Sequence, residues 1–368
     1  MIPLIFPIIE LKDIITSYRN KKKQIDRQGV LANDFGKRYA FFVTEGREAL
    51  AMALEDLRLE KEDQVIVPSY VCDIVPKVVE RFATVIYAEI NPSTLVVDAE
   101  EIKKLISEKT KAVIAVHLYG KVNDLIKIYD LCRGRNIALI EDCAQAIYSF
   151  EEKTRAGSLG DYTIVSFRFS KDINLCKGGA LLSNKPIHSI KKTRNSLFAL
   201  FEILLVYILL RSQWLFWGRL YYYTKEYLLN PYFSKTKYQP KNIRNELSPF
   251  EQELVLEILK KMAYVSSKKK QVASMYISLL KDIDGVDLCE IKNNSLMRFN
   301  ILACNREPLI RILHENGFES DKMYSYSMST KCIKSLQVSE RIVNLPVHPG
   351  VSKRHVEKIC RIIRQYYA

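Results

Sequence analysis

The sequence predicts an α/β fold in which helices flank a mostly parallel central sheet and a smaller C-terminal α+β domain follows. The first supporting observation is the alternation of short apolar runs with amphipathic stretches from about residue 40 to 185, which is the pattern of β-α units. The second is a long helical pattern over residues 248–282 that would lead into the second domain. A chain of 368 residues, 48% hydrophobic, can form both cores. We therefore expect a large domain over residues 1–247 and a connecting helix with a small domain over residues 248–368.

Six apolar runs are expected to be strands of the large domain. A helix precedes them, because Ala49, Ala53 and Leu57 recur at helical spacing, and Pro68 ends the first strand. The expected strands are 64–67, 85–88, 112–116, 137–140, 162–165 and 180–182. Since ligands bind beyond the carboxyl ends of strands in open α/β sheets, polar residues that follow these runs become site candidates.

The second domain begins with a helix start signal at Ser248-Pro249. Leu254, Ile258, Leu259 and Met262 form one apolar face of the long helix that follows. After it, we expect a strand over 297–303, a helix over 308–316 that ends at Gly317, and a closing helix over 355–367.

An apolar insertion over residues 197–223 does not fit an ordinary surface loop. A bilayer span needs ~20 apolar residues, whereas the clean part of this segment is shorter, contains Glu202 and ends at Arg211. Two interpretations remain open. The insertion is a helix buried against this subunit or its dimer mate, or it is an interfacial membrane helix anchored by Trp214, Trp217 and neighbouring tyrosines.

Charge and cysteine usage limit the possible partners. Lys and Arg number 56 against 42 Asp and Glu, and the net charge of +14 favours an anionic partner such as nucleic acid, a membrane surface or a phosphorylated substrate. No nucleic-acid-binding motif is present, so we expect no nucleic acid. The eight scattered cysteines form no metal-ligand spacing, which predicts a reduced, cytosolic setting and no metal. The apolar segment over residues 1–7 is too short for a signal peptide.

Residues at the ends of three β-rich runs have the spacing that pyridoxal phosphate chemistry needs in a fold-type-I enzyme. Asp142 ends one run, Ser166 ends another and precedes Lys171, and Gly178-Gly179 begins the third. In this chemistry a lysine forms a Schiff base with the cofactor, a buried carboxylate keeps the pyridine nitrogen protonated, and hydroxyl and amide groups hold the phosphate. We assign these roles to Lys171, Asp142 and Ser166.

Local alternatives exist for two of these assignments. Lys177 is the rival of Lys171, and Glu141 is the rival of Asp142. Gly46-Arg47 opens a helix, where free amides favour an anion, and is a second candidate for the phosphate. Gln145 reaches the cofactor ring or makes a local helix cap. His117 follows a strand directly, and it either approaches the ligand or is a packed, hydrogen-bonded core histidine.

Several phrases in order resemble the DegT/StrS family of pyridoxal phosphate-dependent sugar aminotransferases. The likeness runs from about residue 40 to 185 and resumes at 248–280 and 344–350. The phrases are Val67-Pro68-Ser69-Tyr70, Val116-His117-Leu118-Tyr119-Gly120, Ile140-Glu141-Asp142-Cys143-Ala144-Gln145-Ala146, Gly157-Ser158-Leu159-Gly160-Asp161 and residues 166–179.

The resemblance implies that an amino donor, glutamate or glutamine, loads the cofactor and that the amine passes to a keto group on a nucleotide-linked sugar. It also implies a homodimer in which each site is built from both subunits. Lys171 would hold the cofactor covalently, and family dehydratases replace this lysine. The implied cofactor contacts are Asp142, Gln145, Ser166, Gly46, Arg47 and Cys72, and the candidate substrate contacts are Tyr70, His117 and Tyr119.

Three positions depart from the family pattern. Arg47 stands where the family usually has Thr, Cys72 where an aromatic ring commonly stacks on the cofactor, and Pro249 where an asparagine often reaches the partner's phosphate.

We expect a cytoplasmic sugar aminotransferase of surface-glycan or glycosylated-metabolite synthesis, with peripheral contact to the inner face of a membrane through residues 197–223. The alternatives are a dehydratase, a transaminase for a non-sugar ketone, and a non-catalytic relic of the fold that binds a membrane or a partner.

Overall fold

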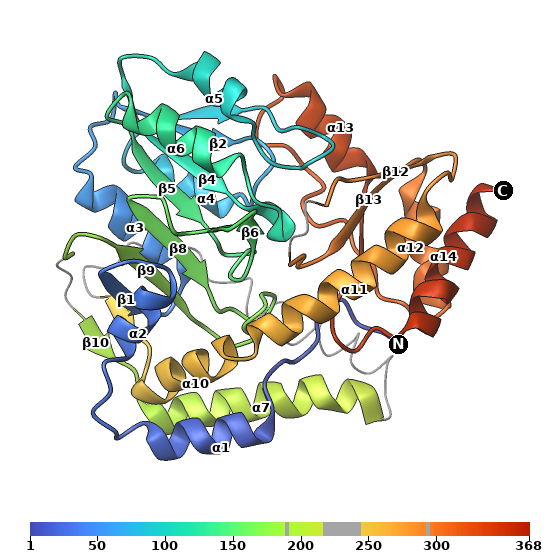
Figure 1. The fold of residues 1–368 in the computed structure, drawn as a ribbon, viewed down its shortest axis with the longest axis horizontal. Coiled ribbons are helices and arrows are strands. Elements are labelled where there is room, and N and C mark those ends of the chain that lie inside the picture. Colours follow the sequence, from blue (N-terminus) through green and yellow to red (C-terminus); the bar gives the residue numbers. More distant parts are fainter. Residues whose placement is uncertain (188–190, 216–243, 292–294) are drawn as a thin grey trace.

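The central element of the molecule is a seven-stranded sheet with the order β1-β9-β8-β5-β4-β2-β3 (Figure 1). The computed structural model describes residues 1–187, 191–215, 244–291 and 295–368. Only β9 runs antiparallel to its neighbours within this sheet. The strands are β1 (Tyr39–Val43), β2 (Gln64–Pro68), β3 (Thr84–Ala88), β4 (Thr110–Val116), β5 (Ala138–Asp142), β8 (Tyr162–Ser166) and β9 (Gly179–Ser183). The predicted mostly parallel sheet is confirmed.

All six predicted strands are present, and β1 is a strand that we did not expect. It lies at the sheet edge and pairs with β9, so that Phe42 lies opposite Ala180. Alternate residues of β1 enter two different buried clusters, because successive side chains of a strand point to opposite faces. Phe41 joins a cluster with β2 and β4, whereas Phe42 joins one with α10.

Helices surround this sheet. Their bounds are α1 (Leu11–Asn20), α2 (Arg27–Asp34), α3 (Gly46–Asp56), α4 (Ile74–Val79), α5 (Ala99–Leu105) and α6 (Leu125–Arg133). A short 3-10 turn, η1 (Leu118–Gly120), follows β4. Two small ribbons complete the large domain: β6 (Phe150–Glu151) with β7 (Thr154–Arg155), and β10 (Lys191–Thr193) with β11 (Arg244–Glu246).

The single long helix expected over 248–282 is wrong, since the structure has two helices, α10 (Pro249–Leu259) and α11 (Met262–Leu280). The predicted start is present: Ser248 caps α10 and forms a capping box with Glu251. At the break, the Lys261 amine binds the carboxylates of Glu10 (2.8 Å) and Asp13 (2.6 Å) beside α1. A contact with the amino-terminal helix therefore accompanies the interruption.

The small domain contains a three-stranded antiparallel sheet and its own buried cluster. Its elements are β12 (Val286–Leu288), β13 (Phe299–Ala303), β14 (Ile342–Leu345), α12 (Arg306–Glu315), α13 (Ile333–Arg341) and α14 (Lys353–Tyr367). The buried cluster joins the second half of α11 to β12, β13, β14, α12 and α14, whereas Val338 of α13 belongs to the cluster that contains β2 and β4. Helix α10 packs in a third cluster with α1, α2 and α7. The division between residues 247 and 248 stays a prediction.

The insertion begins as helix α7 (Ser196–Leu215), which packs against α10 along one edge of the molecule (Figure 1). Residues 216–223 of the predicted insertion lie outside the described part. Glu202 is buried and binds the Arg194 guanidinium, so this acid faces the protein. Among the described residues, no helix has the length and apolarity needed to cross a membrane.

Candidate active site

A cavity of about 310 Å³ lies at the carboxyl ends of β4, β5 and β8, where a loop of the small domain reaches it. Parallel strands place their terminal residues at one edge, so side chains distant in sequence meet there. Of the ten candidate site residues, seven line this cavity: Gly46, Arg47, Cys72, Asp142, Gln145, Ser166 and Lys171.

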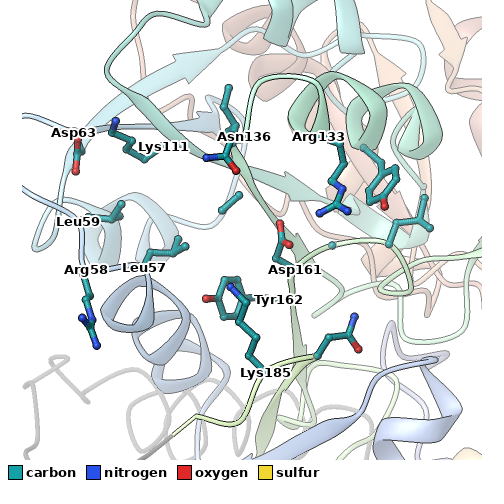
Figure 2. A pocket seen from close by; sticks show the side chains of 16 residues that line it. Leu57, Arg58, Leu59, Asp63, Lys111, Arg133, Asn136, Asp161, Tyr162 and Lys185 are labelled. Carbon is teal, nitrogen blue, oxygen red and sulfur yellow. The ribbon is translucent and has the colours of Figure 1, made fainter.

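A larger hollow, of about 530 Å³, lies at the opposite end of the sheet (Figure 2). Its walls come from the first residues of β5 and β8, including Ala138 and Tyr162, and from the end of α3 at Leu57. None of the ten candidates lines it. Because ligands of open α/β sheets bind beyond the carboxyl ends of the strands, the smaller cavity is the candidate active site.

Asp142, rather than Glu141, faces the cavity. Successive strand residues point to opposite faces, and Glu141 instead accepts hydrogen bonds from the amides of Gly157 (2.6 Å) and Gly160 (2.6 Å). Asp142 Oδ1 accepts one from the Ala144 amide at 2.9 Å. Burial raises the pKa of the Asp142 carboxyl, against the effect of that amide and of nearby Lys171. A buried carboxylate is stabilised by a cation, and a protonated pyridine nitrogen is one.

Lys171 lies in the same cavity, whereas Lys177 does not. Burial lowers the pKa of the Lys171 amine. An uncharged amine is the form that condenses with an aldehyde. The Lys177 amine lies instead 3.7 Å from Glu202, in a partly exposed ion pair with α7. The geometry favours Lys171 over its rival.

The part of the cavity next to Gly46 and Ser166 is suited to an anion. A Cβ on Gly179 would lie 2.7 Å from the Gly46 amide nitrogen, and a Cβ on Gly46 would lie 3.2 Å from the Ser166 Cβ. The glycines therefore let the start of α3 approach Ser166 closely, and free amides at a helix start favour an anion. Arg47 and Arg168 also line this region, and burial together with the Arg47 charge lowers the pKa of Arg168.

Arg168 was not among the predicted site residues, although it stands between Ser166 and Lys171 in the sequence. Its position in the sequence, close to both of these predicted site residues, was the signal that could have identified it.

Gln145 connects the cavity to the small domain. Its Oε1 accepts a hydrogen bond from the Tyr119 amide, and its Nε2 donates one to the Tyr324 hydroxyl, both at 2.9 Å. Tyr324 lines the cavity and was not predicted. The hydroxyls of Tyr70 and Tyr119 lie 3.2 Å apart, and both donate to the Met323 carbonyl. These two tyrosines support the cavity wall from behind, and their role at the substrate stays a prediction.

His117 is fully buried behind Asp142 and does not line the cavity. Its Nδ1 accepts hydrogen bonds from the Asn123 backbone and side-chain nitrogens, at 3.3 and 3.1 Å, so the ring proton is on Nε2 and is donated to Glu141 at 2.9 Å. This is the packed, hydrogen-bonded alternative. His117, Glu141 and Cys143 place potential metal-ligand atoms within 4.8 Å of one another, but backbone amides already occupy the Glu141 carboxylate.

The cavity fits pyridoxal phosphate. It combines an amine whose pKa is lowered by burial, a carboxylate for which the described residues show no ion pair, and a region lined by the start of α3, the Ser166 hydroxyl, Arg168 and the ion pair of Arg47 with Glu45 (2.6 Å). These groups match the aldehyde, the pyridine nitrogen and the phosphate of the cofactor.

The chain matches known proteins over nearly its full length. The model of the DegT/DnrJ/EryC1/StrS aminotransferase family matches residues 13–198 and 221–364. GDP-perosamine synthase of Vibrio cholerae is 29% identical, over 100% of this chain and 99% of that protein.

Two solved structures share the fold. One is S. venezuelae DesV in complex with a ketimine intermediate, at 19% identity and a TM-score of 0.76, covering 99% of this chain and 98% of that one. The other is a GDP-4-keto-6-deoxymannose-3-dehydratase, at 18% identity and a TM-score of 0.77, covering 98% and 100%. The fold is that of fold-type-I enzymes, the cofactor is pyridoxal phosphate, and this chain, a transaminase, belongs to the DegT/DnrJ/EryC1/StrS aminotransferase family.

Proposed function

We propose that this transaminase moves an amino group from glutamate or glutamine to the keto group of a nucleotide-linked sugar, in the synthesis of a surface glycan or a glycosylated metabolite. The observation that carries the proposal is the meeting of Lys171 and Asp142 in one cavity. The full-length similarity to a GDP-perosamine synthase supports a nucleotide-linked sugar as the acceptor.

When bound, the cofactor supplies an electron sink next to the reacting carbon. The Lys171 Nζ would hold the cofactor, and the same amine would carry a proton to and from the substrate carbon. Burial lowers the pKa of this amine, and a lowered pKa favours the uncharged form that both tasks need. Asp142 would keep the ring nitrogen protonated, and Ser166, Arg47 and Arg168 would hold the phosphate.

We propose a homodimer that completes the site. The phosphate contacts that this chain would supply are the start of α3, Ser166 and the two arginines. Pro249 is the first residue of α10 and follows the Ser248 cap. Pro249 lacks a side-chain donor, so Arg168 would compensate for the missing contact from the partner. In an Arg168→Met variant, weaker pyridoxal phosphate binding with unchanged dimerisation is the expected result.

The assignment of the lysine is tested by absorption. We expect Lys171→Ala to lose the visible absorption band of the lysine-bound cofactor and Lys177→Ala to retain it. The opposite pattern would refute the proposed site.

The reaction is tested with half-reactions. Glutamate or glutamine should convert the cofactor to its amine form, and a keto sugar linked to a nucleotide should convert it back. Release of ammonia with loss of a hydroxyl would identify a dehydratase, and conversion by simple 2-oxo acids alone would identify a non-sugar transaminase. A protein that binds no pyridoxal phosphate would support the non-catalytic alternative.

We also propose that the chain is cytoplasmic and rests on the inner face of a membrane through α7. The exposed side chains in the described part of this helix are Leu197, Phe198, Phe201, Leu205 and Ile208. At 100° per residue they fall within about 100° of one another, so they form one apolar stripe. Phe201 is 66% exposed, which is unusual for a soluble helix.

The basic side chains near the apolar stripe of α7 favour an anionic lipid surface as its binding partner. Helix α1 also packs against α10 and runs along the same edge of the molecule as α7 (Figure 1). Lys12, Arg19, Lys22 and Lys23 are exposed on and after α1. An apolar stripe near basic side chains suits an interface with anionic lipids.

Flotation of the full chain with vesicles that contain phosphatidylglycerol tests the contact. We expect Phe198→Ser/Phe201→Ser to remove most of the bound fraction, and Ile126→Ser/Ile333→Ser, at exposed positions elsewhere, to leave it unchanged. Equal flotation of both variants would refute the membrane contact. A change of oligomeric state in the first variant alone would instead identify the stripe as a contact between subunits.

A further inference from the structure

Tyr324 is an aromatic residue of the small domain that lines the candidate active site. It belongs to the loop between α12 and α13. Its hydroxyl accepts a hydrogen bond from Gln145 Nε2 at 2.9 Å. Its ring contacts Tyr70 edge to face, with centroids 6.0 Å apart, and lies 6.3 Å from Tyr119. The Tyr326 ring lies 5.9 Å away as well, so three tyrosines hold the Tyr324 ring at the cavity wall.

The backbone of Tyr324 is in the left-handed region, with φ of +53°. This conformation is uncommon for a residue with a bulky side chain and persists only where surrounding contacts impose it. Here the contacts are those of the ring and hydroxyl within the cavity wall. A strained backbone that directs a side chain into a ligand cavity is the kind of outlier that points to a function.

Cys72 lines the same cavity and lies beside Tyr324, whose pKa is raised by burial and by this neighbouring thiol. The Cys72 thiol offers little surface, whereas the family pattern described above has an aromatic ring at this position, which stacks on the cofactor. A protonated pyridine ring is attracted to the electron-rich face of an aromatic side chain.

We infer that Tyr324 supplies the aromatic surface for the cofactor ring that Cys72 does not provide, and so positions the cofactor from the small domain. The inference rests on the proposed attachment of the cofactor at Lys171. Since the ring comes from a loop 252 residues further along the chain than position 72, the contact depends on the packing of the small domain against the large one.

The test is the affinity of the cofactor-free full chain for pyridoxal phosphate, followed by absorption and by visible circular dichroism. We expect Tyr324→Leu to weaken binding about fivefold and to reduce the dichroic band, because it removes the ring but keeps a bulky side chain at the strained position. We expect Tyr324→Phe, which keeps the ring, to bind within about twofold of the original chain.

A rescue variant makes the test specific. In the Tyr324→Leu background, Cys72→Phe should restore most of the lost affinity, since it returns an aromatic ring to the cavity. Equal affinity of Tyr324→Leu and the original chain for pyridoxal phosphate would overturn the inference. A Tyr324→Phe variant that binds the cofactor as weakly as Tyr324→Leu would also overturn it, because the hydroxyl and not the ring would then be responsible. Failure of the lysine assignment is distinguishable, since Lys171→Ala would then keep its visible band.

Discussion

His348 makes the stability of this protein sensitive to acid. Its ring is buried, and its Nε2–H donates to the Pro3 carbonyl at 2.8 Å, while Nδ1 accepts from the Gly350 amide at 3.2 Å. The ring also stacks on Phe6, with centroids 5.0 Å apart. Both nitrogens are thus used by the neutral form, and a second proton would remove the acceptor. Burial lowers the pKa of His348 from 6.5 to about 3.

The sign follows from proton counting. Between about pH 6.5 and about pH 3, the unfolded chain carries a proton on this histidine and the folded chain does not. The unfolded state binds more protons, so the free energy of unfolding falls as the pH falls through this window. At about 1.4 kcal/mol per pH unit, the full loss is about 5 kcal/mol, and about 2.7 kcal/mol is lost by about pH 4.5.

We propose to measure urea unfolding of the full chain at about pH 7 and about pH 4.5. His348→Gln keeps a donor and an acceptor but cannot titrate, so its free energy of unfolding should fall by about 2.7 kcal/mol less than that of the original chain. His355→Gln is the matched control: partial burial lowers the pKa of His355, and its effect should be smaller. If His348→Gln and the original chain lose the same amount, the reasoning is refuted.

Three further predictions concern close packing and buried charge. Gly179→Ala should lower the free energy of unfolding by about 2 kcal/mol or more and weaken cofactor binding, because its Cβ would meet backbone atoms at 2.7 to 2.9 Å. Gly36 has open space around it, so Gly36→Ala should cost only about 1–2 kcal/mol and leave cofactor binding unchanged. Equal cofactor affinities in titrations of the two variants would contradict this. Glu141→Gln should lower the unfolding free energy by about 1–3 kcal/mol, since backbone amides lose their charged acceptor, and an unshifted melting temperature would argue against it. Asp172→Asn removes the negative charge that neutralises the buried Lys269 ammonium and should cost about 3–5 kcal/mol in urea unfolding. Adding Lys269→Met should recover part of the loss, and no recovery would show that charge burial is not the cause.

Much of the active site could be predicted because its signals are local. Apolar runs followed by polar residues mark where strands end, and parallel strands bring these ends to one edge. Asp142, Ser166 and Lys171 were found in this way. The choice between Asp142 and Glu141 also has a local cause, the alternation of strand side chains, but the sequence did not say which of the two faces the cavity.

The sequence by itself determined the strand pattern of the large sheet and the residue types needed for the cofactor, since both depend on short stretches of chain. The tertiary structure alone decided the break between α10 and α11, where Lys261 meets α1, the burial of Glu202 of α7 against Arg194, and the entry of Tyr324 into the cavity. Each of these depends on contacts between segments that are separate in the sequence, and hydrophobic periodicity carries no information about which distant side chain will meet another. The physical reason is that such contacts are fixed by how whole helices, strands and loops pack together in the folded chain.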